Sequence, residues 1–90
     1  DMGRTKFKVT LGIMPDYMFT GSGVKVDGVK EDKPAKNAGI QKGDIIKSLG
    51  GIEITDINVY MECLGKFEPG ETVEAVIERD GQIMTMVLVL

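Results

Sequence analysis

Apolar and polar residues alternate along several short stretches of the chain, and this two-residue period predicts β-strands. The alternating stretches are residues 7–11, 23–29 and 72–78. Asp80 and Gly81 are a tight-hairpin signal, so residues 82–90 are expected to run back as the final strand. Gly12 interrupts the first stretch. The pattern therefore predicts a chain built mainly from short strands.

One substantial helix is predicted by a period of 3.6 residues. Its apolar face has the spacing i, i+3, i+4 and i+7 and consists of Ile57, Tyr60, Met61 and Leu64. Thr55 or Asp56 is expected to cap the helix, because either side chain can accept a hydrogen bond from a first-turn amide. Tyr60 and Leu64 are interpreted as core residues, whereas the other two fit the core and an exposed binding wall about equally well.

A second, shorter helix is predicted at the start of residues 34–52, PAKNAGIQKGDIIKSLGGI. Pro34 suits the first helical position because its missing N–H would have no partner there, and Gly39 suits a left-handed helix end. Turns are expected at residues 43–44 and 50–51, with a short apolar strand between them. A helix of about one and a half turns is unstable alone in water, so packing has to hold it in place.

The pattern Pro-Ala-x-x-Ala-Gly-Ile-x-x-Gly-Asp-x-Ile-x-x-Leu-Gly-Gly in this stretch resembles the central signature of PDZ domains, in the form found in bacterial proteases. The resemblance implies an α+β, mainly β fold, a small antiparallel partial barrel of five or six strands with two helices. It covers residues 8–90 as a single domain, and residues 1–7 are expected to be a frayed N-terminal segment. The long last hairpin implies the circularly permuted bacterial form, in which the terminal strand replaces the first strand of animal PDZ domains.

Charge and composition argue against several classes of function. The 90 residues carry 11 basic and 14 acidic side chains, for a net charge of −3, and the scattered basic residues argue against a nucleic-acid partner. The longest apolar run is far shorter than the about 18 residues of a membrane-spanning helix, so we expect no membrane insertion by this domain. Cys63 is the only cysteine and follows apolar helix positions, so we expect a buried small hydrophobe.

Catalytic chemistry has little support in the sequence. The chain has no histidine, so neither a Ser-His nor a Cys-His pair can form within it, and a common metal ligand is missing. The carboxylates fall in predicted turns and on polar strand faces, which is typical of solvated surface. Asp44 is interpreted as a turn residue that accepts backbone amides after Gly43, and not as an acidic ligand. We therefore expect neither enzyme activity nor a cofactor in this domain.

A binding site is expected at an exposed sheet edge beside the helix, where an extended chain can add as a strand. In PDZ domains a loop with the consensus Gly-Leu-Gly-Phe offers backbone amides to the terminal carboxylate of the ligand, and residues 10–13 are the matching stretch. The amides of Leu11, Gly12 and Ile13 could converge on one anion because Gly12 has no Cβ, and Lys6 or Lys8 could add charge. The expected peptide-binding residues are Thr10, Leu11, Gly12, Ile13, Met14, Pro15, Tyr17, Ile57, Met61 and Leu64.

Pro15 argues against ordinary peptide capture, because it lies two residues after Ile13. Because alternate residues of a strand point to the same edge, Pro15 should face the ligand at the same edge as Ile13. Pro15 has no N–H to donate to the ligand. One lost hydrogen bond costs about 1 kcal/mol, and an edge proline also blocks strand addition. Two hypotheses stay open. The domain binds a polypeptide C-terminus or an internal extended segment, or it is a structural domain that docks on the catalytic domain of a parent peptidase with its groove blunted by Pro15.

Residues 11–17, LGIMPDY, carry a second resemblance, to the start of the PDZ domain appended to bacterial di-zinc aminopeptidases. This resemblance implies a parent aminopeptidase at the periplasm or cell surface, with its zinc ions and catalytic residues outside this chain. A serine protease is the second class of parent that the resemblance to protease PDZ domains implies.

Overall fold

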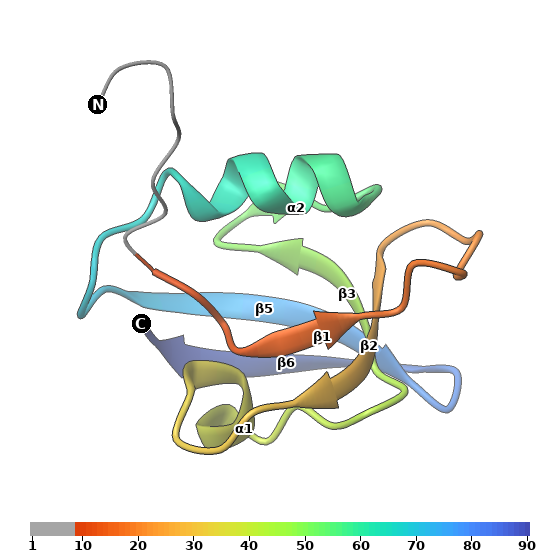
Figure 1. The fold of residues 1–90 in the computed structure, drawn as a ribbon, viewed down its shortest axis with the longest axis horizontal. Coiled ribbons are helices and arrows are strands. Elements are labelled where there is room, and N and C mark those ends of the chain that lie inside the picture. The colour runs from red at the N-terminus through yellow and green to blue at the C-terminus, as the bar shows by residue number, and fades with distance from the viewer. Residues whose placement is uncertain (1–8) are drawn as a thin grey trace.

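The computed structural model describes residues 9–90, and its strands and helices follow the order that the sequence predicts (Figure 1). The strands are β1 (Ile13–Pro15), β2 (Val24–Val29), β3 (Ile45–Leu49), β4 (Ile52–Glu53), β5 (Thr72–Arg79) and β6 (Gln82–Val89). The helices are α1 (Pro34–Ala38) and α2 (Ile57–Leu64). The predicted frayed segment, residues 1–7, lies outside the described residues.

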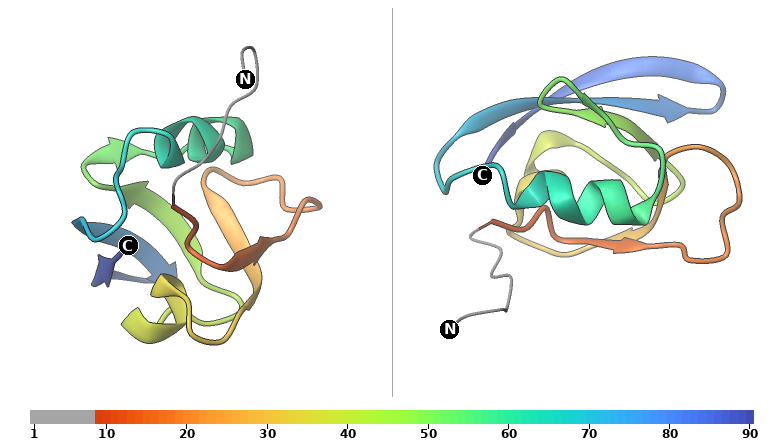
Figure 2. Two further views of the ribbon diagram at one scale, coloured as in Figure 1. Left: turned by 60° about the vertical axis from the view of Figure 1, so that its left-hand side comes forward. Right: turned by 90° about the horizontal axis from the view of Figure 1, so that it is seen from above.

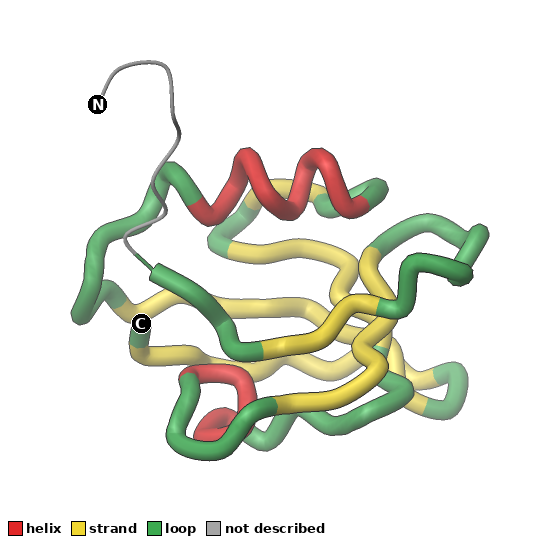
Figure 3. The backbone as a smooth tube through the Cα atoms, in the orientation of Figure 1, coloured by secondary structure: helices red, strands yellow, loops and turns green. Residues whose placement is uncertain are grey.

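The strands form one curved antiparallel sheet in the order β1-β2-β3-β5-β6, with β4 paired to β3 (Figures 1 and 3). β1 and β6 are therefore the two edge strands of this path. The helices lie on different sides of the sheet, with α2 running alongside the segment that contains β1 and α1 packing near β6 (Figures 1 and 2). This arrangement confirms the predicted fold class.

The core lies where the strand alternation predicts it. Along β5, Val73, Ala75 and Ile77 are buried and Glu74 is exposed. Cys63 is also buried, as predicted, and its Sγ lies 3.6 Å from the carbonyl oxygen of Leu49. Burial raises the pKa of this thiol, which keeps it protonated. The core side chains are Val9, Leu11, Val24, Val26, Ala35, Ile40, Ile46, Leu49, Ile54, Tyr60, Cys63, Leu64, Phe67, Val73, Ala75, Ile77 and Leu88.

The short helix α1 is held by contacts with the segment that precedes β1. It begins at Pro34 and ends at Ala38, and it is capped by Gly39, whose φ of 99° is left-handed, as predicted. Ala35 is fully buried, and its N–H donates to the carbonyl of Leu11 at 2.9 Å. The N–H of Ile40 donates in turn to the carbonyl of Ala35, also at 2.9 Å. The loop before β1 and the signature helix therefore position each other.

The first strand is shorter than the sequence pattern indicated. Val9 and Leu11 are buried, which agrees with the alternation, but both precede the strand. Gly12 has a φ of 76°, so the backbone turns there and pairing with β2 starts at Ile13. The strand then ends at Pro15, and only three residues of β1 form the edge of the sheet.

Candidate functional site

The free edge of β1 is formed by the backbones of Ile13 and Pro15. Towards β2, the carbonyl of Gly12 accepts from the N–H of Lys30 at 2.8 Å, and the N–H of Asp16 donates to the carbonyl of Lys25 at 2.9 Å. Backbone groups of alternate residues in a strand point to opposite edges. The groups of residues 13 and 15 therefore point away from β2, on the side where the sheet has no further strand.

An open groove lies between this edge and α2. It has a volume of about 340 Å³ and is lined by Val9, Thr10, Ile13, Pro15, Tyr17, Tyr60, Met61 and Leu64. Tyr60 and Leu64 are buried, whereas Met61 is 40% exposed and Tyr17 is 75% exposed. Burial raises the pKa of the Tyr60 hydroxyl, so this wall stays uncharged. The groove is thus apolar, with a free backbone edge along one side.

The loop that leads into β1 requires glycine at its centre. A Cβ on Gly12 would collide with the Cβ of Lys33, because the side chain of Lys33, just before α1, occupies the space that a side chain at position 12 would need. Leu11 anchors the loop, since its side chain is fully buried and its carbonyl accepts from Ala35. The N–H of Gly12 donates to the hydroxyl Oγ1 of Thr10 at 3.2 Å. One of the three predicted anion-binding amides is therefore already bonded within the loop.

Helix α2 is fixed beside the groove by its cap and its buried face. Asp56 is the cap, and its Oδ1 accepts from the N–H of Val59 at 3.0 Å. The buried residues of the helix are Tyr60, Cys63 and Leu64, which leaves Met61 at the groove rim. Ile57 and Met61, which the sequence pattern assigned neither to the core nor to the binding wall, are both incompletely buried.

A smaller cavity of about 120 Å³ continues beyond the groove at the start of α2. Pro15 and Tyr17 line both cavities. Ile57 lines only this second one, together with Asp56 and Phe19. Ile57 therefore does not share a pocket with Met61 and Leu64, contrary to the expectation that all three form one wall.

The structure brings six of the ten predicted binding residues to the groove: Thr10, Ile13, Pro15, Tyr17, Met61 and Leu64. Leu11 and Gly12 do not line the groove. The side chain of Met14 does not line the groove, because its Cε packs against Gly28 of β2. Val9 and Tyr60 line the groove but were not predicted to do so. Lys6 and Lys8 lie outside the described residues.

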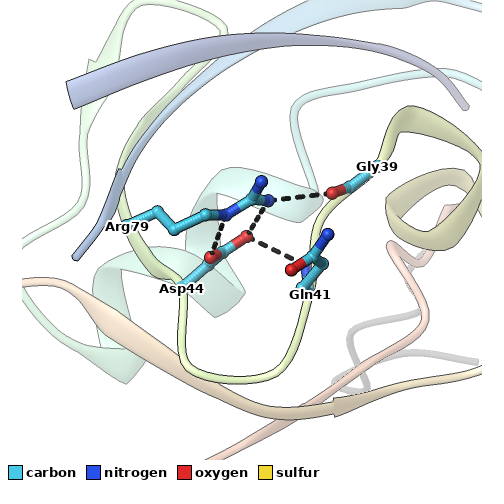
Figure 4. Close-up of polar contacts among 4 residues, drawn as sticks. All are labelled: Gly39, Gln41, Asp44 and Arg79. Carbon is cyan, nitrogen blue, oxygen red and sulfur yellow. Dashed lines mark hydrogen bonds and ion pairs between the residues drawn. The ribbon is translucent and has the colours of Figure 1, made fainter. Parts of the chain in front are cut away.

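Asp44 is part of a polar cluster with Gly39, Gln41 and Arg79 (Figure 4), none of which lines the groove. Asp44 is 1% exposed, and its two carboxylate oxygens accept from Nε and Nη2 of Arg79 at 2.8 and 2.7 Å. Arg79 Nη2 also donates to the carbonyl of Gly39 at 2.9 Å, and the N–H of Gln41 donates to Asp44 Oδ2 at 2.9 Å. This cluster, called the Asp44–Arg79 clamp below, connects the end of α1, the start of β3 and the end of β5 (Figure 4).

The clamp supports the interpretation of Asp44 as a structural residue, with one correction. The amide that it accepts belongs to Gln41, three residues earlier, and not to a residue after Gly43. Burial raises the pKa of the Asp44 carboxyl, but the hydrogen bonds and charge of Arg79 and the Gln41 amide outweigh burial and hold this pKa below its ordinary value. Asp44 is therefore an ionised partner of Arg79 at neutral pH.

Residues 9–90 provide neither a metal-binding cluster nor a membrane-spanning helix. No group of three or more histidine, cysteine, aspartate or glutamate side chains in this range is placed to hold a metal ion. Neither of the helices there has the length and apolar character needed to cross a membrane. Every buried side-chain nitrogen and oxygen in the same range has a hydrogen-bond partner.

A glycine loop, a free strand edge and an apolar groove beside a helix are the features that the resemblance implied. The sequence profile of PDZ domains matches residues 5–90. The chain belongs to the PDZ family. Among curated relatives, this PDZ domain is 40% identical over 60 residues to a DegP-like periplasmic serine endoprotease from Ectopseudomonas mendocina, an alignment that covers 67% of this chain.

Solved structures show the same PDZ fold in two kinds of peptidase. A variant of the HtrA-type protease AlgW, solved with a decapeptide, superimposes with a TM-score of 0.83 and 25% identity, covering 91% of this chain and 28% of that one. An aminopeptidase N family protein from Idiomarina loihiensis has a TM-score of 0.84 and 26% identity, covering 99% of this chain and 15% of that one.

The PDZ domain is only a small part of the proteins it resembles, since it spans 13% of the length of the Ectopseudomonas protease. The Idiomarina structure is one neighbour from an aminopeptidase, and it does not confirm that this domain is of the type appended to di-zinc aminopeptidases. The curated relatives are instead serine proteases, and some of them are described as periplasmic.

Proposed function

We propose that this PDZ domain binds the free C-terminus of a polypeptide, which adds as an antiparallel strand to the free edge of β1. The observation that carries this proposal is the position of that edge. It begins at the Thr10–Ile13 loop, continues along an apolar groove, and faces α2 instead of another strand. A strand added there gains backbone hydrogen bonds, and its alternate side chains enter the groove.

The chemistry of the groove favours an apolar terminal side chain. Its walls include Val9, Ile13 and Leu64, and its volume of about 340 Å³ has room for a side chain of leucine size. The terminal carboxylate would lie at the loop, where the amide of Ile13 can donate to it. The decapeptide in the related AlgW structure is consistent with a peptide ligand for this groove.

A pair of peptides that differ only at the C-terminal group tests this function. We expect a pentapeptide ending in leucine with a free carboxylate to bind at least tenfold more tightly than its C-terminal amide, because hydrogen bonds to a charged group contribute about 1.5–3 kcal/mol. Isothermal titration calorimetry of both peptides measures the ratio. Equal affinity for the two peptides would show that the terminal carboxylate does not contribute to binding, and it would favour an internal extended segment as the ligand.

A docking role on the parent's catalytic domain is the second candidate, and Pro15 is the observation that favours it. Proline removes one donor from an edge of only three residues. Under this alternative, free peptides would leave the groove signals of Ile13 and Met61 unchanged at millimolar concentration. Adding the separately expressed catalytic domain would shift the same signals.

For the parent, we propose an extracytoplasmic serine protease instead of the zinc aminopeptidase that residues 11–17 suggested. The names of the curated relatives support this class, and those that include a location support the periplasm. The domain itself is proposed to need no cofactor. The coding sequence that flanks this domain tests the class of the parent: a Ser-His-Asp protease domain is expected, and a zinc peptidase domain would overturn it.

A further inference from the structure

The edge of the sheet at β6 is longer and more regular than the edge at β1. β6 contains eight residues, Gln82–Val89, and pairs with β5 along its whole length. Within residues 9–90, no strand pairs with the other side of β6. The sequence of the strand, QIMTMVLV, contains no proline and no charged residue. β6 therefore lacks two features, proline and charge, that commonly protect an edge from the addition of another strand.

The backbone groups of four residues in β6 point away from β5. The N–H of Leu90 donates to the carbonyl of Glu71 at 2.9 Å, which fixes the alternation along the strand. Residues at even positions face β5, so residues 83, 85, 87 and 89 direct their N–H and carbonyl groups to the free side. Helix α1 lies beside β6, but no backbone hydrogen bond joins these two elements. The free side of β6 thus offers a regular row of donors and acceptors to another strand.

The same four residues carry a row of exposed and mainly apolar side chains. Ile83, Val87 and Val89 are each more than half exposed, and Thr85 lies between them. The residue opposite Val87 on β5 is the exposed Glu74, which is the polar type expected on the solvated face of an antiparallel sheet. An exposed apolar row on an uncharged edge is instead typical of a surface that another strand covers.

We propose that β6 pairs with β6 of a second copy of this chain, antiparallel and about a two-fold axis that passes beside Met86. In this register Ile83 lies opposite Val89 of the second copy, and Thr85 lies opposite Val87 of the second copy. The free N–H and carbonyl groups of all four outward residues are then bonded. Registers centred on Thr85 or Val87 leave one of these residues in each strand without a partner in the other strand.

The sequence of β6 favours a second copy over an unrelated strand as the occupant. A two-fold axis brings the same surface of both copies together, so the surface must be complementary to itself. β6 meets this condition, because apolar side chains lie opposite one another and neither strand brings a charge to the contact. Like charges directly opposite one another would destabilise such a pair of strands.

The pairing joins two sheets into one and leaves both peptide grooves free. β1 and β6 are the opposite ends of the strand order β1-β2-β3-β5-β6, and no residue of β6 lines the groove. The dimer therefore presents two grooves. A partner with two binding segments could occupy both, with an avidity that exceeds the affinity of one groove.

Sedimentation equilibrium of the unmodified domain, from micromolar to millimolar concentration, tests the pairing. Two paired strands of eight residues form a small interface, so we expect a weak dimer, with an average mass that rises with concentration. Isotope-filtered NMR spectra of mixed labelled and unlabelled protein report the register. Ile83 and Val89 are about 20 Å apart along one strand, so a contact between their methyl groups can only join two copies. A monomeric mass at every concentration, or a dimer without this contact, would overturn the proposal.

Val87→Lys is the variant that should break the dimer. It adds a charge beside the paired strands in both copies, so we expect association to weaken about tenfold or more. Val87 is exposed, so the variant should stay folded, which circular dichroism checks. Met18→Lys is the matched control, because it makes the same change of charge at an exposed apolar side chain outside β6. Equal association of the two variants would contradict the pairing.

Two further measurements separate this proposal from peptide binding and from a different occupant of the edge. Val87→Lys should bind peptides as the wild type does, because Val87 does not line the groove. Loss of the dimer with unchanged peptide affinity would support the assignment of dimerisation to β6. If the domain is monomeric and the separately expressed catalytic domain of the parent shifts the β6 amide signals, the parent covers this edge and the proposal of a second copy is wrong.

Discussion

The groove and the Asp44–Arg79 clamp use polar groups in opposite ways. In the clamp, the Asp44 carboxylate is buried, and both of its oxygens, the Arg79 guanidinium and the Gly39 carbonyl are joined by hydrogen bonds. In the groove, the edge groups of Ile13 and Pro15 face a cavity. Satisfied buried groups stabilise a fold, whereas unpaired groups at an open edge remain available to a ligand. The clamp therefore predicts effects on stability and the groove predicts effects on binding.

Removal of the clamp should have the largest effect. Arg79→Leu leaves the buried Asp44 carboxylate without its charged partner, so we expect it to lower the free energy of unfolding more than the removal of an exposed ion pair does. Urea unfolding followed by circular dichroism measures this loss. Peptide affinity should not change under conditions where the variant is folded.

The control for this variant is Glu78→Gln, which removes the partially exposed pair between Glu78 and Lys47. Such a pair contributes about 0–1 kcal/mol, so its loss should be small. If the two variants were equally stable, the clamp would be no more than a surface ion pair.

Substitution of the loop glycine should cost somewhat less stability. Gly12→Ala requires a positive φ and places a Cβ against Lys33, and we expect a loss of about 2–3 kcal/mol from backbone strain and overpacking. Gly51→Ala is the matched control, because Gly51 also has a positive φ, of 83°, but has open space around its Cβ position. Thermal unfolding of both variants separates the cost of backbone strain from the cost of overpacking. Identical losses of stability would show that the contact with Lys33 is unimportant.

A fall in pH should weaken the clamp without affecting the groove. The pKa of Asp44 lies below its ordinary value of 3.8, because the folded protein stabilises the carboxylate. The stability that this carboxylate contributes is therefore complete above the unfolded pKa and is lost as the pH falls through the lower, folded pKa. Urea unfolding from pH 6 downwards should show this loss in the wild type, and Asp44→Asn should lack the corresponding part of the pH dependence. An identical pH profile for both would contradict the pairing.

The smallest effect is expected at Thr10, on the groove side of the comparison. The Thr10 hydroxyl accepts from the Gly12 N–H, so it competes with a ligand carboxylate for that donor. Thr10→Val frees the amide and should tighten binding of a free C-terminus a few-fold, up to about fivefold. Binding of the matching C-terminal amide should remain unchanged. Weaker binding would instead indicate that the hydroxyl holds the loop in its binding form.

Local signals in the sequence predicted the strands, both helices and their order. Pro34 with Gly39 marked α1, and the spacing of Tyr60 and Leu64 marked α2. The partner of Asp44 left no such signal, because Arg79 lies 35 residues away and the pair forms only when β5 lies beside β3. Contacts of this range depend on strand order and register, which a single sequence does not specify.

The differences between the predicted binding residues and the groove lining have physical causes that the sequence partly contained. The two-residue period that placed Ile13 and Pro15 on one edge also places Met14 on the other, which agrees with its absence from the groove lining. Tyr60 was assigned to the core, but a buried side chain can also form the wall of an open groove. Ile57 lies one helical turn before Met61, and that distance is enough to place it in the neighbouring cavity.

One titration tests the contrast between groove and clamp directly. In ¹H–¹⁵N correlation spectra, the backbone amides of Leu11, Gly12 and Ile13 report on the loop, and the Nε–H of Arg79 reports on the clamp. Addition of acetyl-Ala-Ala-Leu with a free carboxylate is predicted to shift the loop amides and those of α2, and to leave the Arg79 signal in place. The account would be contradicted if the signals of the loop amides did not shift, or if the Arg79 signal shifted as much as that of Gly12.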